Sequence, residues 1–505
     1  MTNRSGRPNI LFITSDQQHW DTLGASNPEI KTPHLDQLAA QGMRCHRAYC
    51  PNPTCTPSRS SMITGLYPSD HGAWSLGTKL MENVPTVSQA LGAAGYHTSL
   101  VGKAHFQPLQ ETEQYRSLES YPTLQDLDFW RSFDQPFYGF DTVRLARNHA
   151  DEAHVGQHYA IWLEENGCDN WRDYYRPPTG TNDRQKHLWE IPEKYHYNAW
   201  IAEESNRQLD GFAESGEPFM LWSSFFDPHP PYLAPDPWHT MYDPSALTLP
   251  QVVEGEHDAN PLHFRMTQET NPDFSDWRES GFGIRGMHSH LHDADQMRQN
   301  LAVYYGMISL MDEYIGRILA HLEQLGLADN TLVVFTTDHG HLFGQHGMTA
   351  KGPFHYEDLV KLPFLVRWPD RVEAGSESDA LLSLVDMTPS FLSAAGVTAD
   401  WGMSGVDQTP VWTGAAGSVR DHVVVENRHE PTTIHTRTYI DDRHKLTVHY
   451  GRDEGELFDL ASDPKEIDNH WADPEWAKTR AKLTQSLLHA ELGKEPLAMP
   501  RIAGA

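Results

Sequence analysis

A cysteine stands at the start of a predicted helix in the stretch PTCTPSR, residues 53–59. Pro57 suits the first turn of a helix over residues 56–64, and Cys55 directly precedes that turn. Free N–H groups and the positive dipole end of a helix stabilise an anion, and Arg59 adds a full positive charge one turn on. A thiol titrates near ~8.5 in water, and this setting would lower its pKa. The pattern indicates an anion site or a reactive thiolate, with a buried structural cysteine as the plain alternative.

Redox or zinc chemistry is a weaker interpretation of the cysteines. Cys45, Cys50 and Cys55 have the spacing C-x4-C-x4-C, whereas zinc sites and redox motifs favour C-x2-C. The fourth cysteine, Cys168, is remote from the other three. Four cysteines in this arrangement are not a disulfide framework, and they favour a reducing compartment.

Polar and charged side chains follow several predicted buried strands. Because ligands bind beyond the carboxyl ends of strands in open α/β sheets, these residues are candidates for a shared site. Two carboxylates and an imidazole from separate strand ends would hold a hard cation. Taken singly, an Asp after a strand is more often a turn or a helix cap. The candidates are Asp16 with Gln17, Lys103 with His105, Asp227 with His229, and Asp338 with His339.

The tripeptide Asp-His-Gly occurs twice and so provides an internal control. Asp70-His71-Gly72 lies in a loop that leaves a helix, whereas Asp338-His339-Gly340 follows the buried-strand run TLVVFTT. Only the second copy has the context of a site at a strand end, so the tripeptide alone is weak evidence.

Strands alternate with helices along most of the chain. This alternation predicts an α/β fold with a large, mostly parallel sheet sandwiched by helices. Predicted strands cover residues 9–15, 96–101, 218–226, 330–337 and 362–368, and predicted helices start near residues 32, 56, 84 and 300.

The texture of the sequence changes after about residue 416. Short strands at 422–426, 438–440 and 444–448, with a last helix over 474–492, predict a small antiparallel C-terminal subdomain. We therefore divide the chain into a catalytic domain, 1–416, and a subdomain, 417–505. Two loosely patterned segments, about 107–197 and 235–296, are interpreted as insertions that shape the substrate pocket.

The formal net charge of −30 over 505 residues limits the classes of partner that the protein can bind. Such a surface repels polyanions, so we expect neither nucleic acid nor membrane as a partner. The N-terminus lacks a secretory apolar segment and no stretch reaches membrane-spanning length, so we expect a cytoplasmic location. The apolar C-terminal tail, KEPLAMPRIAGA, leaves assembly into a homo-oligomer open.

The stretch CTPSR resembles the sulfatase signature Cys-x-Pro-Ser-Arg, and it is followed by the TG-x-YP turn of that family at residues 64–68. Further resemblances cover most of the chain: NILFITSDQ, TPHLD at 32–36, GKAH at 102–105, Asp338-His339-Gly340, Lys351-Gly352, and ELFDL with DP at 456–464. The resemblance implies the alkaline phosphatase type of fold. It also implies that a formylglycine-generating enzyme oxidises Cys55 to Cα-formylglycine, whose hydrate is a nucleophile and a metal ligand.

Two positions depart from the pattern of many sulfatases. Asp16-Gln17 stands where many members have Asp-Asp, and Asp338-His339 where they have Asp-Asn. Both pairs look more like the choline sulfatase and phosphonate monoester hydrolase branch. The implied metal ligands are Asp16, Cys55 after modification, Asp338 and His339, and Gln17 is either a ligand or a residue behind the ligands. Calcium is the first expectation for the divalent ion, with manganese or magnesium as alternatives.

The resemblance and the charges agree on catalytic roles. Arg59 would position the aldehyde hydrate, and Lys103 and Lys351 would clamp sulfate oxygens. His229 or Lys351 would protonate the leaving oxygen. Attack would give a sulfated hydrate, and His105 would help to remove the second hydroxyl proton as that hydrate collapses to the aldehyde and sulfate. The nearby His341 and His346 receive no role.

Three functions compete at this point. The first is a sulfuric ester hydrolase of the arylsulfatase type that acts on small-molecule aryl or alkyl sulfate esters. The second is a phosphonate monoester or phosphodiester hydrolase with the same formylglycine nucleophile. The third is a non-catalytic protein that binds a metal and an anion and keeps Cys55 unconverted.

Overall fold

The computed structural model describes residues 6–147, 154–176 and 188–494. Its centre is a sheet in which eight strands of the described chain take the order β12-β2-β11-β7-β1-β6-β4-β5. Five neighbours, from β7 to β5, run parallel, and β11 runs antiparallel to both β7 and β2. The strands are β12 (Ser376–Ser378), β2 (Met43–Cys45), β11 (Phe364–Arg367), β7 (Thr331–Thr337), β1 (Asn9–Ser15), β6 (Phe219–Ser224), β4 (His97–Gly102) and β5 (Thr142–Leu145).

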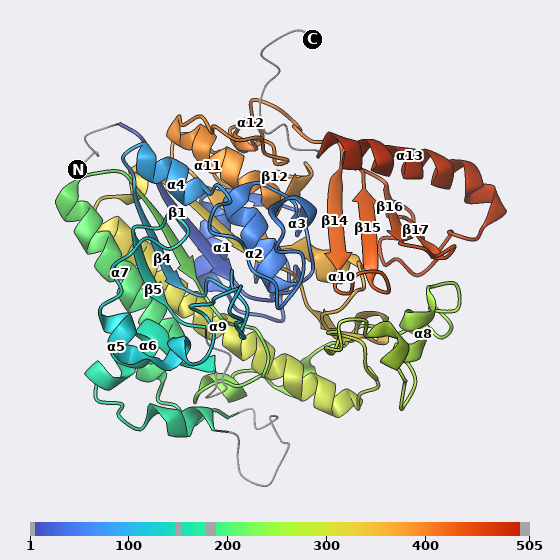
Figure 1. Ribbon diagram of the computed structural model, residues 1–505, viewed down its shortest axis with the longest axis horizontal. Coiled ribbons are helices and arrows are strands. Elements are labelled where there is room, and N and C mark those ends of the chain that lie inside the picture. Colours follow the sequence, from blue (N-terminus) through green and yellow to red (C-terminus); the bar gives the residue numbers. More distant parts are fainter. Residues whose placement is uncertain (1–5, 148–153, 177–187, 495–505) are drawn as a thin grey trace.

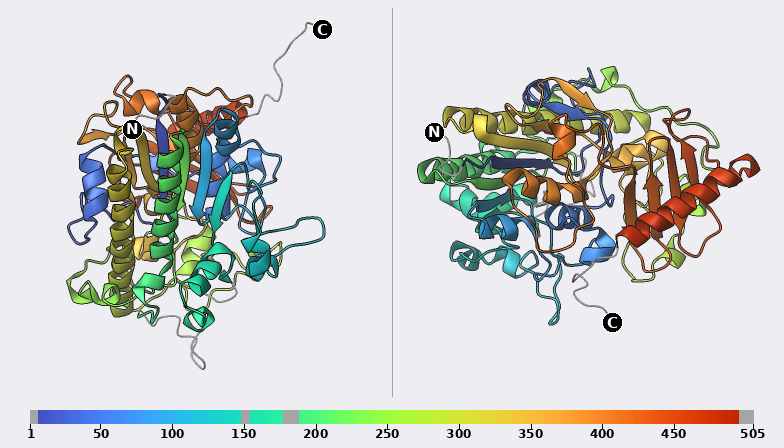
Figure 2. Two further views of the ribbon diagram at one scale, coloured as in Figure 1. Left: turned by 90° about the vertical axis from the view of Figure 1, so that its left-hand side faces the viewer. Right: turned by 90° about the horizontal axis from the view of Figure 1, so that it is seen from above.

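Helices cover both faces of this sheet (Figures 1 and 2). Alternate residues of the central strands belong to two separate apolar clusters, because successive side chains of a strand point to opposite faces. Leu11 and Ile13 pack with one set of helices, and Ile10 and Phe12 pack with the other. The first set is α1 (Pro33–Ala40), α6 (Gln157–Glu165), α7 (Tyr197–Ser215) and α9 (Ala294–Gln324); the second is α2 (Cys55–Thr64), α4 (Val87–Ala93), α11 (Met387–Ala395) and α12 (Thr409–Trp412).

Capping side chains explain where two helices differ from the sequence expectation. Helix α9 begins at Ala294, earlier than the predicted start near 300, because the Asp293 carboxylate accepts the N–H groups of Asp295 and Gln296. Helix α4 begins at Val87 rather than near 84, because Thr86 forms a capping box with Gln89.

A second, antiparallel sheet lies next to the large one and carries helix α13 across one face (Figure 1). It consists of β14 (Val423–Arg428), β15 (His435–Ile440), β16 (His444–His449) and β17 (Gly455–Asp459), and α13 spans Ala477–Gly493. The predicted α/β class, with a mostly parallel main sheet and a small antiparallel one, is therefore confirmed. The domain boundary at 416 and 417 stays a prediction.

The first predicted insertion is in part an element of the main sheet. Strand β5 lies within it and pairs in parallel with β4, which makes β5 the edge of the large sheet. Alternation over four residues is too short a signal to distinguish an edge strand from a loop. Residues 148–153 and 177–187 of that insertion, and the apolar tail after 494, lie outside the described residues.

Smaller elements complete the described chain. Strands β8 (Leu342–Phe343) and β9 (Thr349–Ala350) form a hairpin that leads from the end of β7 to Lys351. Every helix in the described ranges is too short or too polar to cross a bilayer. The remaining strands and α-helices of the described chain are β3 (Ala48–Tyr49), β10 (Lys361–Leu362), β13 (Leu382–Ser383), α3 (Pro68–His71), α5 (Leu127–Arg131), α8 (Leu262–Thr267) and α10 (Glu357–Val360).

Candidate active site

Helix α2 places Cys55 at its own first position, inside the protein. Thr54 before it is extended, and the side-chain oxygen of Asn52 accepts both the N–H (2.8 Å) and the hydroxyl (2.6 Å) of Thr54. All ten residues of α2 are buried, and the hydroxyl groups of Ser58, Ser61 and Thr64 form hydrogen bonds there. One of them, Ser58, donates its hydroxyl to the backbone carbonyl of Asp338 at 2.6 Å. The helix start is thereby fixed against the end of β7.

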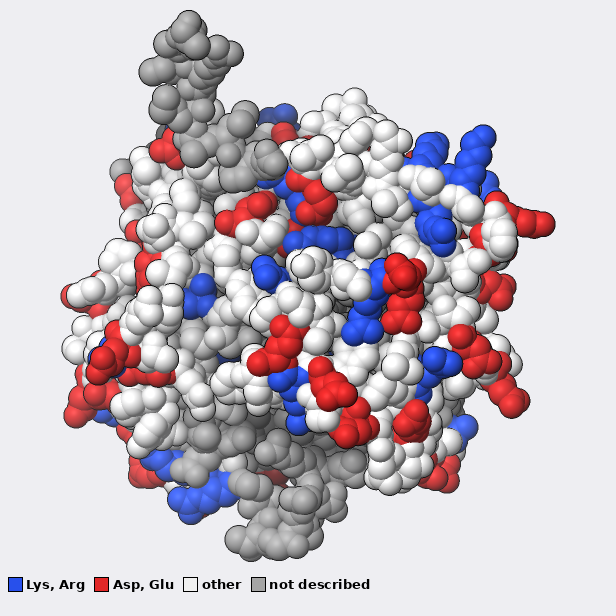
Figure 3. Space-filling model, turned by 45° about the vertical axis from the view of Figure 1, so that its right-hand side comes forward, with Lys and Arg blue, Asp and Glu red and all other residues white. Residues whose placement is uncertain are grey.

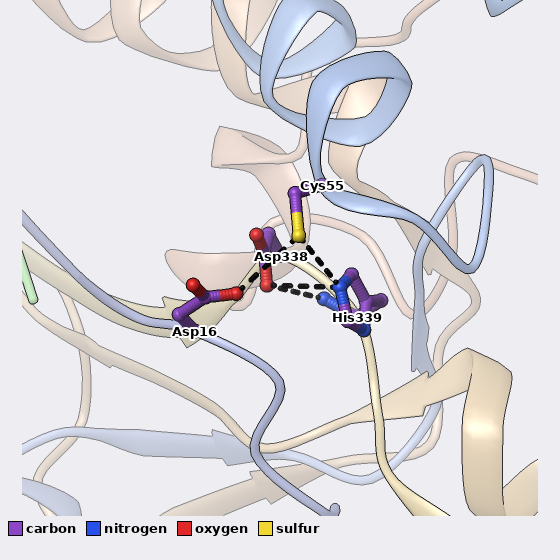
Figure 4. A group of neighbouring side chains, drawn as sticks. All are labelled: Asp16, Cys55, Asp338 and His339. Atoms are coloured by element: carbon purple, nitrogen blue, oxygen red, sulfur yellow. Dashed lines mark hydrogen bonds and ion pairs between the residues drawn. The ribbon is translucent and has the colours of Figure 1, made fainter. Parts of the chain in front are cut away.

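Four predicted metal ligands converge, as Figure 4 shows. One ligand atom from each of Asp16, Cys55, Asp338 and His339 lies within 4.8 Å of the others, and all four residues are buried. The Cys55 Sγ lies 3.6 Å from Asp16 Oδ1 and 3.1 Å from His339 Nε2. Asp16 follows β1 and Asp338 follows β7, and because these strands are parallel neighbours their carboxyl ends meet at one edge.

Burial and neighbouring charges displace the pKa values of these candidate ligands. Burial, helped by the carboxylate of Asp338, raises the pKa of Asp16 to about 7. Burial also acts on Asp338, but His339 and Arg59 outweigh it and hold the pKa of that carboxyl well below its usual range. Burial lowers the pKa of His339 to about 4, which keeps the imidazole neutral and able to ligate.

Three buried cations surround the four ligands. Lys103 Nζ forms a very short contact with Asp16 Oδ2, and Arg59 Nε donates to Asp338 Oδ2 at 2.8 Å. Lys351 Nζ lies 3.1 Å from Cys55 Sγ and 3.2 Å from His339 Nε2. Burial opposes ionisation of the Cys55 thiol, but Lys103 and Lys351 outweigh burial and lower its pKa. The direction agrees with the sequence prediction, but the two lysines contribute more than Arg59, on which that prediction relied.

The structure also brings His229 to this group. Its Nε2 lies 3.4 Å from Lys351 Nζ, and its Nδ1 contacts the carbonyl of Pro230 at 2.6 Å. A carbonyl can only accept, so the ring proton is on Nδ1 and Nε2 accepts from the lysine. Burial and then Lys351 hold the pKa of His229 well below its usual range, in agreement with a neutral ring.

His105 lies in the loop after β4, two residues beyond Lys103. Its backbone has a φ of +58°, a left-handed conformation that costs energy for a residue with a Cβ. It is 6% exposed, and burial followed by the charge of Arg147 holds its pKa well below the usual range. The structure therefore holds a neutral imidazole in a strained loop.

Several site residues were not identified from the sequence. Ser224 at the end of β6 accepts from Arg59 Nη1 at 2.7 Å, and Tyr232 contacts His341 Nε2 at 2.7 Å. The Gln17 amide nitrogen contacts the other nitrogen of His341, also at 2.7 Å. Ser224 ends a buried strand, and Tyr232 follows Asp227 and His229 closely. Their positions near the ends of strands were the signal by which the sequence could have identified them. His341, which had received no role, orients the Gln17 amide.

The cluster fits a divalent metal ion. It combines two carboxylates and a neutral imidazole in a dry setting, a set of oxygen and nitrogen ligands that a divalent cation accepts. The Gln17 side-chain oxygen is buried and has no hydrogen-bond partner in the described part of the chain, while its nitrogen is bound to His341. This unpaired acceptor oxygen would be satisfied if it coordinated a metal ion. Among the residues described, no other group of three or more His, Cys, Asp and Glu meets the same spacing.

A family model described as sulfatase matches residues 8–397. The chain belongs to the sulfatase family. A second model, described as the C-terminal part of N-sulphoglucosamine sulphohydrolase, matches residues 344–492 of this sulfatase.

Relatives and solved structures agree with the predicted branch of the sulfatases. An arylsulfatase of Clostridium perfringens is 27% identical over 506 residues, covering 97% of this chain and 95% of that protein. A choline-sulfatase of Rhizobium meliloti is 24% identical, covering 95% and 85%. The crystal structure of a phosphonate monoester hydrolase of Agrobacterium radiobacter has a TM-score of 0.79 at 25% identity, covering 98% of this chain and 97% of that one. The predicted resemblance to this group is confirmed.

Proposed function

We propose that this sulfatase hydrolyses aryl or small alkyl sulfate esters and that formylglycine, made from Cys55, is its nucleophile. The position of Cys55 carries the proposal: its Sγ lies at the start of α2, within contact of His339 and Lys351. Two carboxylates and three buried cations lie around it, which is more charge than a purely structural cysteine requires. A formylglycine-generating enzyme is the implied partner during maturation, and the donor set suits calcium first, with manganese or magnesium as alternatives.

A divalent ion held by Asp16, Asp338, His339 and the modified residue 55 would supply positive charge for sulfate oxygens and lower the pKa of the aldehyde hydrate. Gln17 is a further candidate ligand through its orphaned oxygen. The side chains around residue 55 would bind and orient the substrate. Lys103, which contacts Asp16, and Lys351, which contacts Cys55, would bind the non-bridging oxygens of the ester. Arg59, fixed by Asp338 and Ser224, holds the start of α2 in place.

Lys351 is the proton donor toward the leaving oxygen that the geometry favours. Its ammonium already donates toward His229 Nε2, which has no proton of its own in the tautomer set by Pro230. His229 is the alternative donor once it has taken that proton. His105 is neutral and would accept a proton from the second hydroxyl of the hydrate.

The second candidate function is phosphonate monoester or phosphodiester hydrolysis with the same nucleophile. The structural likeness to a phosphonate monoester hydrolase favours it, as do the pairs Asp16-Gln17 and Asp338-His339. Sulfate and phosphonate groups are both tetrahedral oxyanions, so the cluster of cations suits either one.

A matched pair of substrates separates the two functions. We expect kcat/KM for an aryl sulfate to exceed kcat/KM for an aryl phosphonate with the same leaving group. A large preference for the phosphonate would replace the first proposal by the second. Cys55→Ala should abolish both activities and leave the far-UV circular dichroism unchanged, whereas a protein that binds an anion without turnover would be inactive before the substitution as well.

A further inference from the structure

A buried ion pair lies directly behind the loop that carries His105. Glu119 Oε2 accepts from Arg147 Nη1 at 2.7 Å, and both side chains are 2% exposed. The pair is more than a contact between two charges, because the second oxygen of Glu119 is also used. Glu119 Oε1 accepts the backbone N–H of Phe106 at 2.9 Å and that of Gln107 at 3.2 Å.

These two amides are the first two after His105. They follow a residue with a φ of +58°, so the loop needs fixed points to hold this backbone conformation. The loop is also tied by the N–H of Leu80 to the carbonyl of Phe106 at 2.9 Å, and by the N–H of Leu118 to the side-chain oxygen of Gln107 at 2.7 Å. Of these three ties, the carboxylate of Glu119 is the charged one, and charge-assisted hydrogen bonds are the stronger kind.

Arg147 reaches this place because β5 is the edge of the large sheet. The residue after β5, Ala146, donates its N–H to the carbonyl of Gly102 at 3.1 Å, directly before Lys103. Arg147 therefore stands beside the end of β4, where Lys103 and His105 begin the catalytic loop. Its charge is also the largest Coulombic influence on His105, and together with burial it disfavours protonation of that ring.

We propose that Glu119 and Arg147 are positioning residues for His105: the carboxylate fixes the two amides after His105, and the guanidinium fixes the carboxylate. The catalytic part of this inference rests on the proposed ester hydrolysis. The structural part does not, because the hold of Glu119 on the loop is measurable without a substrate.

The variants separate the two interactions of Glu119, its hydrogen bonds to the two amides and its ion pair with Arg147. Glu119→Ala removes the acceptor for both amides. Arg147→Met leaves a buried carboxylate without its cation, which weakens its hold. The double variant Glu119→Gln with Arg147→Met keeps an amide oxygen for the two N–H groups and leaves no unpaired charge. The matched control is Glu111→Ala, which removes a carboxylate of the same segment that binds Arg116 and the N–H of Ser117.

Two measurements are made on each variant of the full chain after metal loading. Hydrogen–deuterium exchange is followed on the peptide spanning residues 104–109, and kcat and KM are determined with an aryl sulfate. For Glu119→Ala we expect faster exchange of this peptide and a kcat lowered about 10- to 100-fold with KM within about twofold. We expect the double variant to recover most of the kcat lost in Arg147→Met, and Glu111→Ala to match the wild type in both measurements.

Each result decides something specific. Unchanged exchange in Glu119→Ala would overturn the positioning role, as would faster exchange with an unchanged kcat. A double variant no better than Arg147→Met would show that the two charges matter for another reason, which also overturns the proposal. If the wild type hydrolyses neither sulfate nor phosphonate esters, the proposed function has failed instead, and the exchange data still test the hold of Glu119 on the loop. If Glu119→Ala does not fold, Glu119→Gln with Arg147→Met and Arg147→Met alone remain a complete pair.

Discussion

Two clusters of charged side chains inside this molecule differ in their ratio of cations to carboxyl groups. At the candidate active site, the described residues bring Arg59, Lys103 and Lys351 against two carboxylates, Asp16 and Asp338. The second cluster joins the antiparallel sheet to the main body. There Lys445 of β16 contacts Glu357 at 2.8 Å and Glu466 at 2.7 Å, and its third donor reaches the carbonyl of His355 at 2.9 Å.

The difference shows which cluster is built for a ligand. All three donors of Lys445 are used within the protein, and two carboxyl groups face this one cation. The active site has an excess of positive charge inside a chain of net charge −30, and one of its lysines contacts a thiol and two imidazoles rather than a carboxylate. Figure 3 shows acidic side chains interspersed with basic ones on the face in view, so the attraction for an anion is local. We infer that the first cluster serves catalysis and the second serves stability.

Metal removal should give the largest difference between the two clusters, because it should affect activity and leave the fold intact. Dialysis against a chelator is expected to abolish ester hydrolysis, because the ion supplies charge that no side chain replaces. Adding back calcium or manganese should restore it, and elemental analysis of the dialysed protein provides the measurement of loss. The far-UV circular dichroism should stay native, since the second cluster contains its own counter-charges. Full activity in protein shown to be free of metal would contradict this assignment.

Lys351→Met is expected to lower kcat/KM by about 10²- to 10³-fold, the usual cost of removing one preorganised cation or donor from a transition-state site. The melting temperature should not fall, because within the described chain Lys351 makes no ion pair with a carboxylate that the substitution would leave buried. Steady-state kinetics with an aryl sulfate and differential scanning calorimetry are the two measurements. A variant that loses stability but keeps its kcat/KM would place Lys351 with the structural lysines.

Lys445→Met should give the converse result. It leaves the buried Glu466 and the partly buried Glu357 without their cation, and removing one partner of a buried ion pair costs about 3–5 kcal/mol of unfolding free energy. Denaturant unfolding measures this loss, and kcat per folded molecule should equal the wild-type value because the cluster contacts no catalytic side chain. The exposed Lys482 offers a matched control, in which Lys482→Met should change neither property. Loss of kcat in a fully folded Lys445→Met protein would break the comparison.

Glu466→Gln should give the smallest effect, visible as a pH dependence. Burial and the neighbouring Glu357 raise the pKa of Glu466 to about 7, above the value of 4.5 expected for the unfolded chain. A raised carboxyl pKa stabilises the folded state fully below the unfolded pKa, and that contribution is lost as the pH rises through 7. The variant lacks this titration, so its melting temperature should gain about 1–2 °C on the wild type between pH 5 and pH 8. A constant difference across that range would show that Glu466 stays ionised.

The sequence predicts the parts of the site that depend on local pattern. Asp16 and Asp338 end buried strands of strong apolar character, and parallel strands bring their carboxyl ends to one edge. Cys55 and Arg59 share one helix, so their relation also follows from spacing. Only the family resemblance indicates a role for Lys351. This lysine reaches the site through the β8–β9 hairpin, and hydrophobic periodicity does not predict where the residue after a hairpin lies in the fold.

The supporting residues escaped sequence reasoning for a physical reason. Glu119 and Arg147 meet only because β5 joins the edge of the large sheet, and that strand lies in a segment interpreted as an insertion. Lys445 and Glu357 are separated by 88 positions and meet where strand β16 lies beside the start of helix α10. Such pairs depend on tertiary packing, which the pattern of a single chain does not encode at the level of individual contacts.

The state of residue 55 is the central claim, and mass spectrometry of the tryptic peptide spanning residues 48–59 tests it most directly. This peptide contains both Cys50 and Cys55, so Cys50 serves as an internal standard for thiol alkylation. After co-expression with an active formylglycine-generating enzyme, we predict one alkylated cysteine and, at residue 55, the mass change for replacement of CH2–SH by an aldehyde that reacts with a hydrazide probe. A protein that turns over sulfate esters while both cysteines are found fully alkylated would contradict the account.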